Sequence, residues 1–138
     1  MKRVLLAIGL LLPLGVLAAE NPIDRELESC LNSNSSTAGM SQCYDTANRA
    51  WDKEMNTQYQ AVMAKLDDAQ KAKLRDAQRN WLKYRDSWLE ASKAWYLKEQ
   101  GTMAAISLGV QSVELVKNQA LMLKSLKQGA CANPDDCQ

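Results

Sequence analysis

The chain contains no histidine and no phenylalanine among its 138 residues. Without histidine, the Ser-His and Cys-His pairs that activate nucleophiles cannot form, and zinc sites lose their usual imidazole ligands. No glycine-rich phosphate loop is present either. Paired carboxylates such as Asp67 and Asp68 lie outside the apolar surroundings that a catalytic acid needs. We therefore predict no enzymatic activity, no catalytic residues, no metal site and no cofactor.

A long transmembrane run is also missing, although residues 1–19 resemble a signal peptide. A basic start (Lys2, Arg3) precedes an apolar run that Pro13 interrupts, and small residues end the segment. The run is too short for a transmembrane helix, and no cysteine follows it to carry a lipid anchor. We expect a periplasmic or secreted protein with no membrane contact after cleavage, whose residues 20–138 form one domain.

Neither charge sign is in large excess. Without Lys2 and Arg3, the 17 basic residues fall to 15, against 16 acidic residues, so the mature net charge is near −1. A nucleic-acid-binding domain normally carries a basic patch. We therefore expect no nucleic-acid partner.

Aromatic residues are few, but three of the four tryptophans share one helical register. A repeat of seven residues places them on one stripe of a helix expected over about 67–100. The repeat consists of Leu74, Trp81, Trp88 and Trp95. Asp67 with Gln70 resembles a capping box at the start of this helix, and Gly101 suits a left-handed turn at its end.

Apolar residues at spacings of three and four predict further helices over 23–31, 41–66 and 103–126, with a polar loop at 32–39. Short connections between long helices favour antiparallel neighbours. We predict an all-α fold, an antiparallel three-helix bundle with a short N-terminal helix, a core over about 41–128 and a tail at 129–138. The tryptophan repeat should form the central ridge of this bundle.

Counting outward from the two expected turns gives the contacts between the long helices. The first turn sets Asp52 against Arg85, Asn56 against Trp81, and Tyr59 against Gln78. The second sets Trp95 against Leu108, Trp88 against Leu115, and Trp81 against Met122. The six residues that are paired by counting from the first turn form either a polar site or an interhelical network that fixes the register. We favour the network because buried polar groups must be paired.

The four cysteines should form two disulfides after export. Four cysteines allow three connectivities. Cys30 and Cys43 lie at the start of the second helix, whereas Cys131 follows the last helix at the opposite pole, about 40 Å away. Because bridged Cα atoms lie within about 7 Å, we predict Cys30–Cys43 and Cys131–Cys137.

Two surfaces are candidates for a partner. The topology brings Asp67 and Asp68 to the same pole as Asp135 and Asp136, and four carboxylates there would attract a cationic protein. Acids that stabilise a helix start, beside a solvated tail, explain the same residues without a partner. The last helix carries a second apolar stripe that the first helix, a partner or a second copy could cover. This stripe consists of Ile106, Val110, Val113 and Ala120.

Two motifs resemble a known family of small secreted bacterial proteins. Residues 52–59 are similar to its Asp-x-x-Leu-Asn-x-x-Tyr stretch, and residues 77–86 match its Ala-Gln-x-x-Trp-x-x-Tyr/Phe-Arg-Asp signature. The family is named after the LprI-type lysozyme inhibitor, and the resemblance covers about 30–123.

The resemblance implies a non-enzymatic binding protein that masks a partner sterically and electrostatically. That partner would be a cationic lysozyme or another envelope protein. The alternative is a structural or assembly protein of the cell envelope, self-associating through its last helix. We expect a monomer or a weak homodimer.

Overall fold

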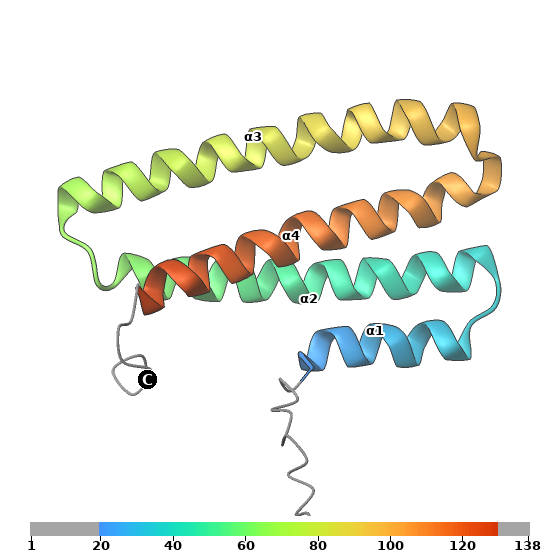
Figure 1. The fold of residues 1–138 in the computed structure, drawn as a ribbon, viewed down its shortest axis with the longest axis horizontal. Helices are drawn as coiled ribbons and strands as arrows, with labels where there is room; N and C mark the ends of the chain where they lie inside the picture. Colours follow the sequence, from blue (N-terminus) through green and yellow to red (C-terminus); the bar gives the residue numbers. More distant parts are fainter. Residues whose placement is uncertain (1–19, 130–138) are drawn as a thin grey trace, which may run out of the picture.

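The computed structural model describes residues 20–129, which form four α-helices and one 3-10 turn. These elements are α1 (Pro22–Ser33), α2 (Thr37–Met63), α3 (Asp68–Glu99), the 3-10 turn η1 (Gly101–Met103) and α4 (Ala104–Gln128). Successive helices run antiparallel, but their spatial order is α1, α2, α4, α3 (Figure 1). The expected signal peptide and the Cys131–Cys137 bridge lie outside the described residues.

The core lies between α2 and α4, which run in the same direction (Figure 1). Apolar residues at spacings of three and four on each helix face one another across this interface. The buried cluster consists of Ala47, Trp51, Met55, Val113, Val116, Ala120 and Leu123. Ile23 and Leu27 of α1 pack against the same cluster, so α1 shares the core of α2 and α4.

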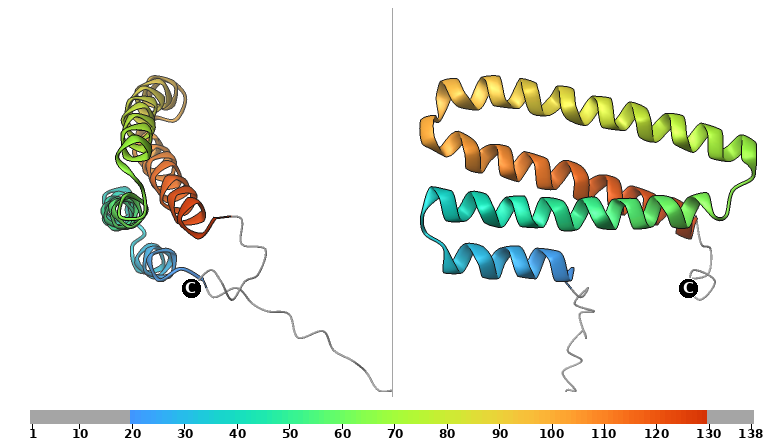
Figure 2. Two further views of the ribbon diagram at one scale, coloured as in Figure 1. Left: turned by 90° about the vertical axis from the view of Figure 1, so that its left-hand side faces the viewer. Right: turned by 180° about the vertical axis from the view of Figure 1, so that it is seen from behind.

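The expected three-helix bundle is not found along the whole length of α3. Near the α2–α3 turn, Leu74 and Trp81 pack against the core cluster. Toward the other end α3 diverges from α2 and stays beside α4 (Figure 2). There the exposed fractions of Trp88 and Trp95 are 45% and 61%. The prediction of a central tryptophan ridge is therefore wrong for these two residues.

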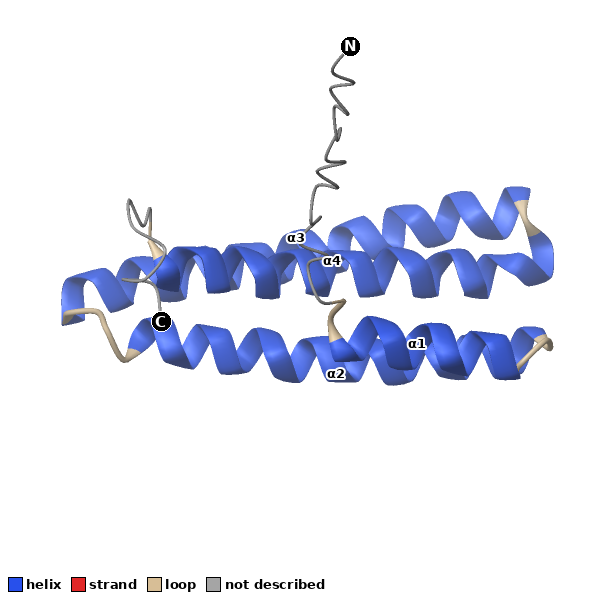
Figure 3. Ribbon diagram, turned by 60° about the horizontal axis from the view of Figure 1, so that its bottom comes forward, coloured by secondary structure: helices blue, strands red, loops and turns tan. Residues whose placement is uncertain are grey.

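A close approach of α2 and α4 helps to explain why α3 lies outside. A Cβ atom added at Gly109 would lie only 2.7 Å from the Cβ atom of Tyr44. Two helices this close leave no groove between them for a third helix of large side chains. The helices therefore form two pairs, α1 with α2 and α3 with α4, which meet along the α2–α4 interface (Figure 3).

The contacts between α3 and α4 differ from the predicted register by about one helical turn. Trp88 Nε1 donates a 2.8 Å hydrogen bond to Gln111, rather than meeting Leu115. Met122, the expected partner of Trp81, is 67% exposed. The η1 turn occupies Gly101–Met103 between the two helices, and α4 begins at Ala104, one residue later than expected. This connection changes which α4 residues stand opposite α3.

Local capping signals in the sequence were more informative than helix spacing. The Asp67–Gln70 capping box is confirmed, with hydrogen bonds of 2.8 and 3.0 Å. Gly101 has the expected positive φ, 56°. The polar loop expected at 32–39 is largely helical, because Ser36 accepts the Gly39 amide at 3.0 Å and starts α2 at Thr37.

Replacing Gly109 by alanine should destabilise the protein despite the better helix propensity of alanine. That propensity is worth about 1 kcal/mol, whereas forcing a methyl group into a packed contact costs about 1–3 kcal/mol. We expect a net loss of about 1 kcal/mol in the free energy of unfolding. Urea denaturation followed by circular dichroism measures this loss. A more stable variant would show that the α2–α4 approach relaxes freely.

Candidate functional site

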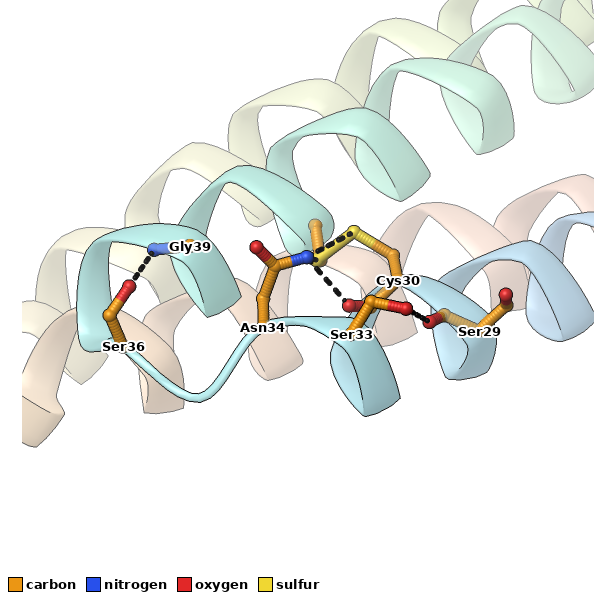
Figure 4. The surroundings of a disulfide bond; sticks show 7 residues. Ser29, Cys30, Ser33, Asn34, Ser36 and Gly39 are labelled. Atoms are coloured by element: carbon orange, nitrogen blue, oxygen red, sulfur yellow. Dashed lines mark hydrogen bonds between the residues drawn. A yellow bond between two sulfur atoms is a disulfide. The ribbon is translucent and has the colours of Figure 1, made fainter.

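The disulfide Cys30–Cys43 is present, as predicted, and joins α1 to α2 with a Cα–Cα distance of 5.7 Å. Asn34 supports the connection, because its side-chain amide donates a 2.8 Å hydrogen bond to the Cys30 carbonyl oxygen (Figure 4). Cys43 is 1% exposed and Cys30 is half-buried. The bridge therefore fixes the short α1 helix to the core and is a structural element.

The six residues expected to form one polar network are divided among three places. Gln78 is 8% exposed and lies between two helices. It accepts a 2.8 Å hydrogen bond from Gln119 and donates to the Met55 sulfur at 3.5 Å. Tyr59 and Trp81 pack against the core cluster nearby. This group links α2, α3 and α4, which is the role expected of a register-fixing contact.

Asp52 and Arg85, expected to face one another, make local contacts instead. Asp52 accepts a 3.4 Å hydrogen bond from Asn56, one turn further along α2. Arg85 donates two hydrogen bonds, of 2.9 and 2.8 Å, to its neighbour Asp86. Its guanidinium also lies 5.6 Å from the centre of the Trp81 ring. The divergence of α3 from α2 explains why the expected pair does not meet.

The predicted acidic tip is described only in its first half. Asp67 and Asp68 are exposed at the start of α3, and the α2–α3 turn lies at one end of the molecule (Figure 1). The Asp67 carboxylate accepts the Gln70 amide, and Asp68 lies 3.9 Å from the Lys71 ammonium. Asp135 and Asp136 lie outside the described residues. The described acids stabilise the helix start and also leave negative charge in solvent.

The second apolar stripe of α4 is mostly internal. Ile106, Val113 and Ala120 are buried, and only Val110 reaches solvent, with 37% exposed. The exposed apolar residues of α4 are others, namely Leu121, Met122 and Leu126. Self-association through the predicted stripe would require opening the core. The surface assigned to the assembly alternative is therefore wrong.

The largest exposed aromatic surface lies on α3. We call it the α3 apolar face and define it by six exposed residues: Ala77, Tyr84, Trp88, Ala91, Ala94 and Trp95. The rings of Tyr84 and Trp88 are neighbours, 6.2 Å apart. Trp88 and Trp95 line a groove of about 280 Å³ that Gln111 of α4 closes on one side. Such a surface is typical of protein interfaces.

Sequence reasoning assigned these tryptophans to the core and missed their exposure. One signal could have found it. From Ala77 to Trp95, every charged residue of α3 avoids the α3 apolar face, which is wider than the stripe that one partner helix covers. An uncharged stripe of this width indicates a second neighbour. Packing against α4 accounts for only part of it.

No group of three or more acidic, cysteine or histidine side chains that could hold a metal ion occurs within residues 20–129. In the same range, no helix combines the length and the apolar character that crossing a bilayer requires.

Comparisons with known proteins agree with the motifs. Residues 30–123 match the family described as lysozyme inhibitor LprI. A crystal structure of an uncharacterized protein from Burkholderia thailandensis is 32% identical in sequence, with a TM-score of 0.67. The match covers 75% of this chain but only 52% of that longer chain. The comparison with curated proteins found no match. Since the family match spans most of the sequence, including both motifs in α2 and α3, the chain belongs to the LprI lysozyme inhibitor family.

Proposed function

We propose that the protein is an exported, non-enzymatic inhibitor that binds a cationic lysozyme and blocks its substrate cleft. Membership of the lysozyme inhibitor family over residues 30–123 is the observation that carries this proposal. The N-terminal segment with signal-peptide character supports export to the periplasm or beyond the cell, where a lysozyme would be met. Inhibition in this proposal is steric and electrostatic, with no chemical step.

The acidic tip is the proposed contact. Asp67 and Asp68 are exposed at the capped start of α3, and Asp135 with Asp136 would add charge from the tail. Carboxylates gathered at one end of an elongated molecule attract a cationic protein and speed its association. Lys71, whose ammonium lies 3.9 Å from Asp68, weakens this field without cancelling it.

Replacing the four tip aspartates by asparagine should weaken lysozyme inhibition about tenfold at low salt, because association loses its electrostatic attraction. The salt dependence of inhibition should become flatter in the same variant. Asparagine caps a helix as well as aspartate does, so the α3 start should stay folded. Lysozyme turbidity assays with purified, oxidised mature protein at several ionic strengths measure both effects.

A matched control removes the same number of carboxylates far from the tip. Its substitutions are Glu26→Gln, Glu28→Gln, Asp45→Asn and Glu114→Gln, all at exposed positions. Inhibition by this control should stay close to that of the wild type. Equal losses in both variants would mean that net charge matters and the tip does not. No inhibition by the wild type at large molar excess would reject the proposed function itself.

A further inference from the structure

The α3 apolar face is long, flat and free of charge. From Ala77 to Trp95 it extends about 28 Å along the helix. The six charged side chains of this segment lie on the other sides of α3; they are Arg79, Lys83, Arg85, Asp86, Glu90 and Lys93. The face therefore has the pattern of a helix that buries two sides, one against α4 and one against a further helix.

We propose that a second copy of this chain covers the α3 apolar face, forming a two-fold symmetric dimer in which the two α3 helices pack antiparallel. This inference is independent of lysozyme binding. α3 is the outermost helix of the molecule, on the side away from α1 (Figures 1 and 2). A second α3 can therefore approach the face without meeting α1.

One antiparallel register sets Trp95 against a small side chain and brings two aromatic residues together near the symmetry axis. With the symmetry axis close to Asp86, Trp95 of one copy stands opposite the partner's Ala77. Trp88 then stands opposite the partner's Tyr84, and the symmetry repeats both contacts. Small residues facing indoles allow two helices to interlock, as knobs fit holes in a coiled coil. The sequence of α3 is thus complementary to itself when reversed, which a two-fold interface requires.

The charges that border the face agree with the same register. Lys83 of one copy stands opposite the partner's Glu90, and symmetry forms the pair twice. Neither side chain takes part in a salt bridge within residues 20–129. Arg85 lies close to the axis, but Asp86 already neutralises it through two hydrogen bonds. Opposite charges on the rim fix orientation and register more than they add affinity.

The available area suits a reversible dimer. Aromatic side chains bury about 150–250 Å² each when fully covered. Tyr84, Trp88 and Trp95 are 53%, 45% and 61% exposed, so two copies together offer roughly 600 Å² from these rings alone. With the alanines and the rim, the contact approaches the lower end of specific interfaces, about 1,200 Å². We expect a dissociation constant in the micromolar range.

A charge-exchange experiment on the oxidised mature chain tests both the interface and its register. In a dimer of the Lys83→Glu variant, two glutamates face one another at both symmetry-related contacts. In a dimer of the Glu90→Lys variant, two lysines face one another at both contacts. Each single variant should dissociate about tenfold more readily than the wild type. The double variant restores both pairs. Mixing the two single variants should also restore dimerisation, because their heterodimer contains two Glu–Lys pairs.

Sedimentation velocity from micromolar to millimolar concentration measures each equilibrium. Recovery on mixing shows that both single variants are folded. Arg79 and Lys93 lie off the face, so Arg79→Glu and Lys93→Glu serve as matched controls and should leave the dimer unchanged. Wild-type protein that stays monomeric at millimolar concentration would overturn the proposal. A dimer whose dissociation constant is unchanged in both single variants would also overturn it. If the wild type is a monomer and the Trp95→Ala variant no longer inhibits lysozyme, the α3 apolar face binds lysozyme and not a second copy.

Discussion

Trp51→Ala should lower the free energy of unfolding by about 3–5 kcal/mol. Trp51 is 1% exposed and is the largest fully buried side chain in the described part of the protein. Its truncation leaves a cavity at the point where α1, α2 and α4 meet, and the surrounding helices can collapse only partly. Small domains are stable by about 5–15 kcal/mol in total. The variant should therefore lose a large share of the total stability of the domain.

The position of Trp51 explains why the loss spreads across three helices. Lys117 of α4 places its ammonium 5.7 Å from the centre of the Trp51 ring. The same ammonium forms a 2.8 Å ion pair with Asp24 of α1. The indole thus supports a contact that holds α1 and α4 together above it. Without the ring, nothing packs beneath the Lys117–Asp24 ion pair, and water reaches both charged groups and weakens their attraction.

Urea denaturation followed by circular dichroism measures this effect, and two variants serve as controls. Trp51→Phe keeps most of the ring volume, and we expect a loss of about 1–2 kcal/mol. The indole nitrogen of Trp51 has no hydrogen-bond partner within residues 20–129, so phenylalanine gives up no polar contact there. Trp95→Ala removes the same side chain from a position that is 61% exposed and should cost the monomer less than about 0.5 kcal/mol. Similar losses for Trp51→Ala and Trp95→Ala would contradict this account of the core.

The start and end of α3 could be predicted from sequence because capping chemistry is local. Asp67 with Gln70, and Gly101 with its positive φ, act through atoms within a few residues. The Cys30–Cys43 pairing was equally accessible, because helix length alone excluded the other connectivities. In each case the contact depends on a separation that follows directly from the sequence, either a few residues at a helix end or the length of one helix.

The packing of α3 could not be predicted in the same way. The heptad repeat states that Trp88 and Trp95 share one stripe, but it does not identify the helix that covers the stripe. Gly109 contributes to the answer, since its missing side chain lets α4 approach α2 closely. A rule based on the spacing of apolar residues does not register such a contact between two other helices.

Of the candidate sites, one could be located from the sequence and one could not. The position of Asp67 and Asp68 at one end of the molecule was accessible from the topology, because a capped turn between long helices has to lie there, whereas the four-residue acidic tip stays a prediction. The α3 apolar face was missed, because a tryptophan repeat was interpreted by its commonest role, core packing. The charge distribution around α3 held the missing information. Counting where charges are absent gives the width of the apolar surface of a helix, and on α3 that width exceeds the contact with one neighbouring helix.

Replacing Cys30 and Cys43 together by alanine should destabilise the protein by about 3 kcal/mol. The bridge closes a loop with a sequence separation of 13, and a loop of this size restricts the unfolded chain by that amount. Alanine is the appropriate substitute because Cys43 is 1% exposed, and serine would bury an unpaired hydroxyl. The melting temperature should fall by roughly 10–20 °C, given the usual slope for a domain of this size.

The loss should appear first in α1, which the bridge holds against α2. Without it, α1 is retained by Ile23, Leu27 and the Lys117–Asp24 pair, and its amides should exchange with solvent well before those of α2 and α4. The double variant keeps Cys131 and Cys137, so any further loss on adding reductant measures their contribution separately. Thermal scans and hydrogen exchange of the oxidised wild type, the double variant and the reduced wild type give the comparison. A double variant within about 0.5 kcal/mol of the wild type would show that apolar packing alone holds α1 in place.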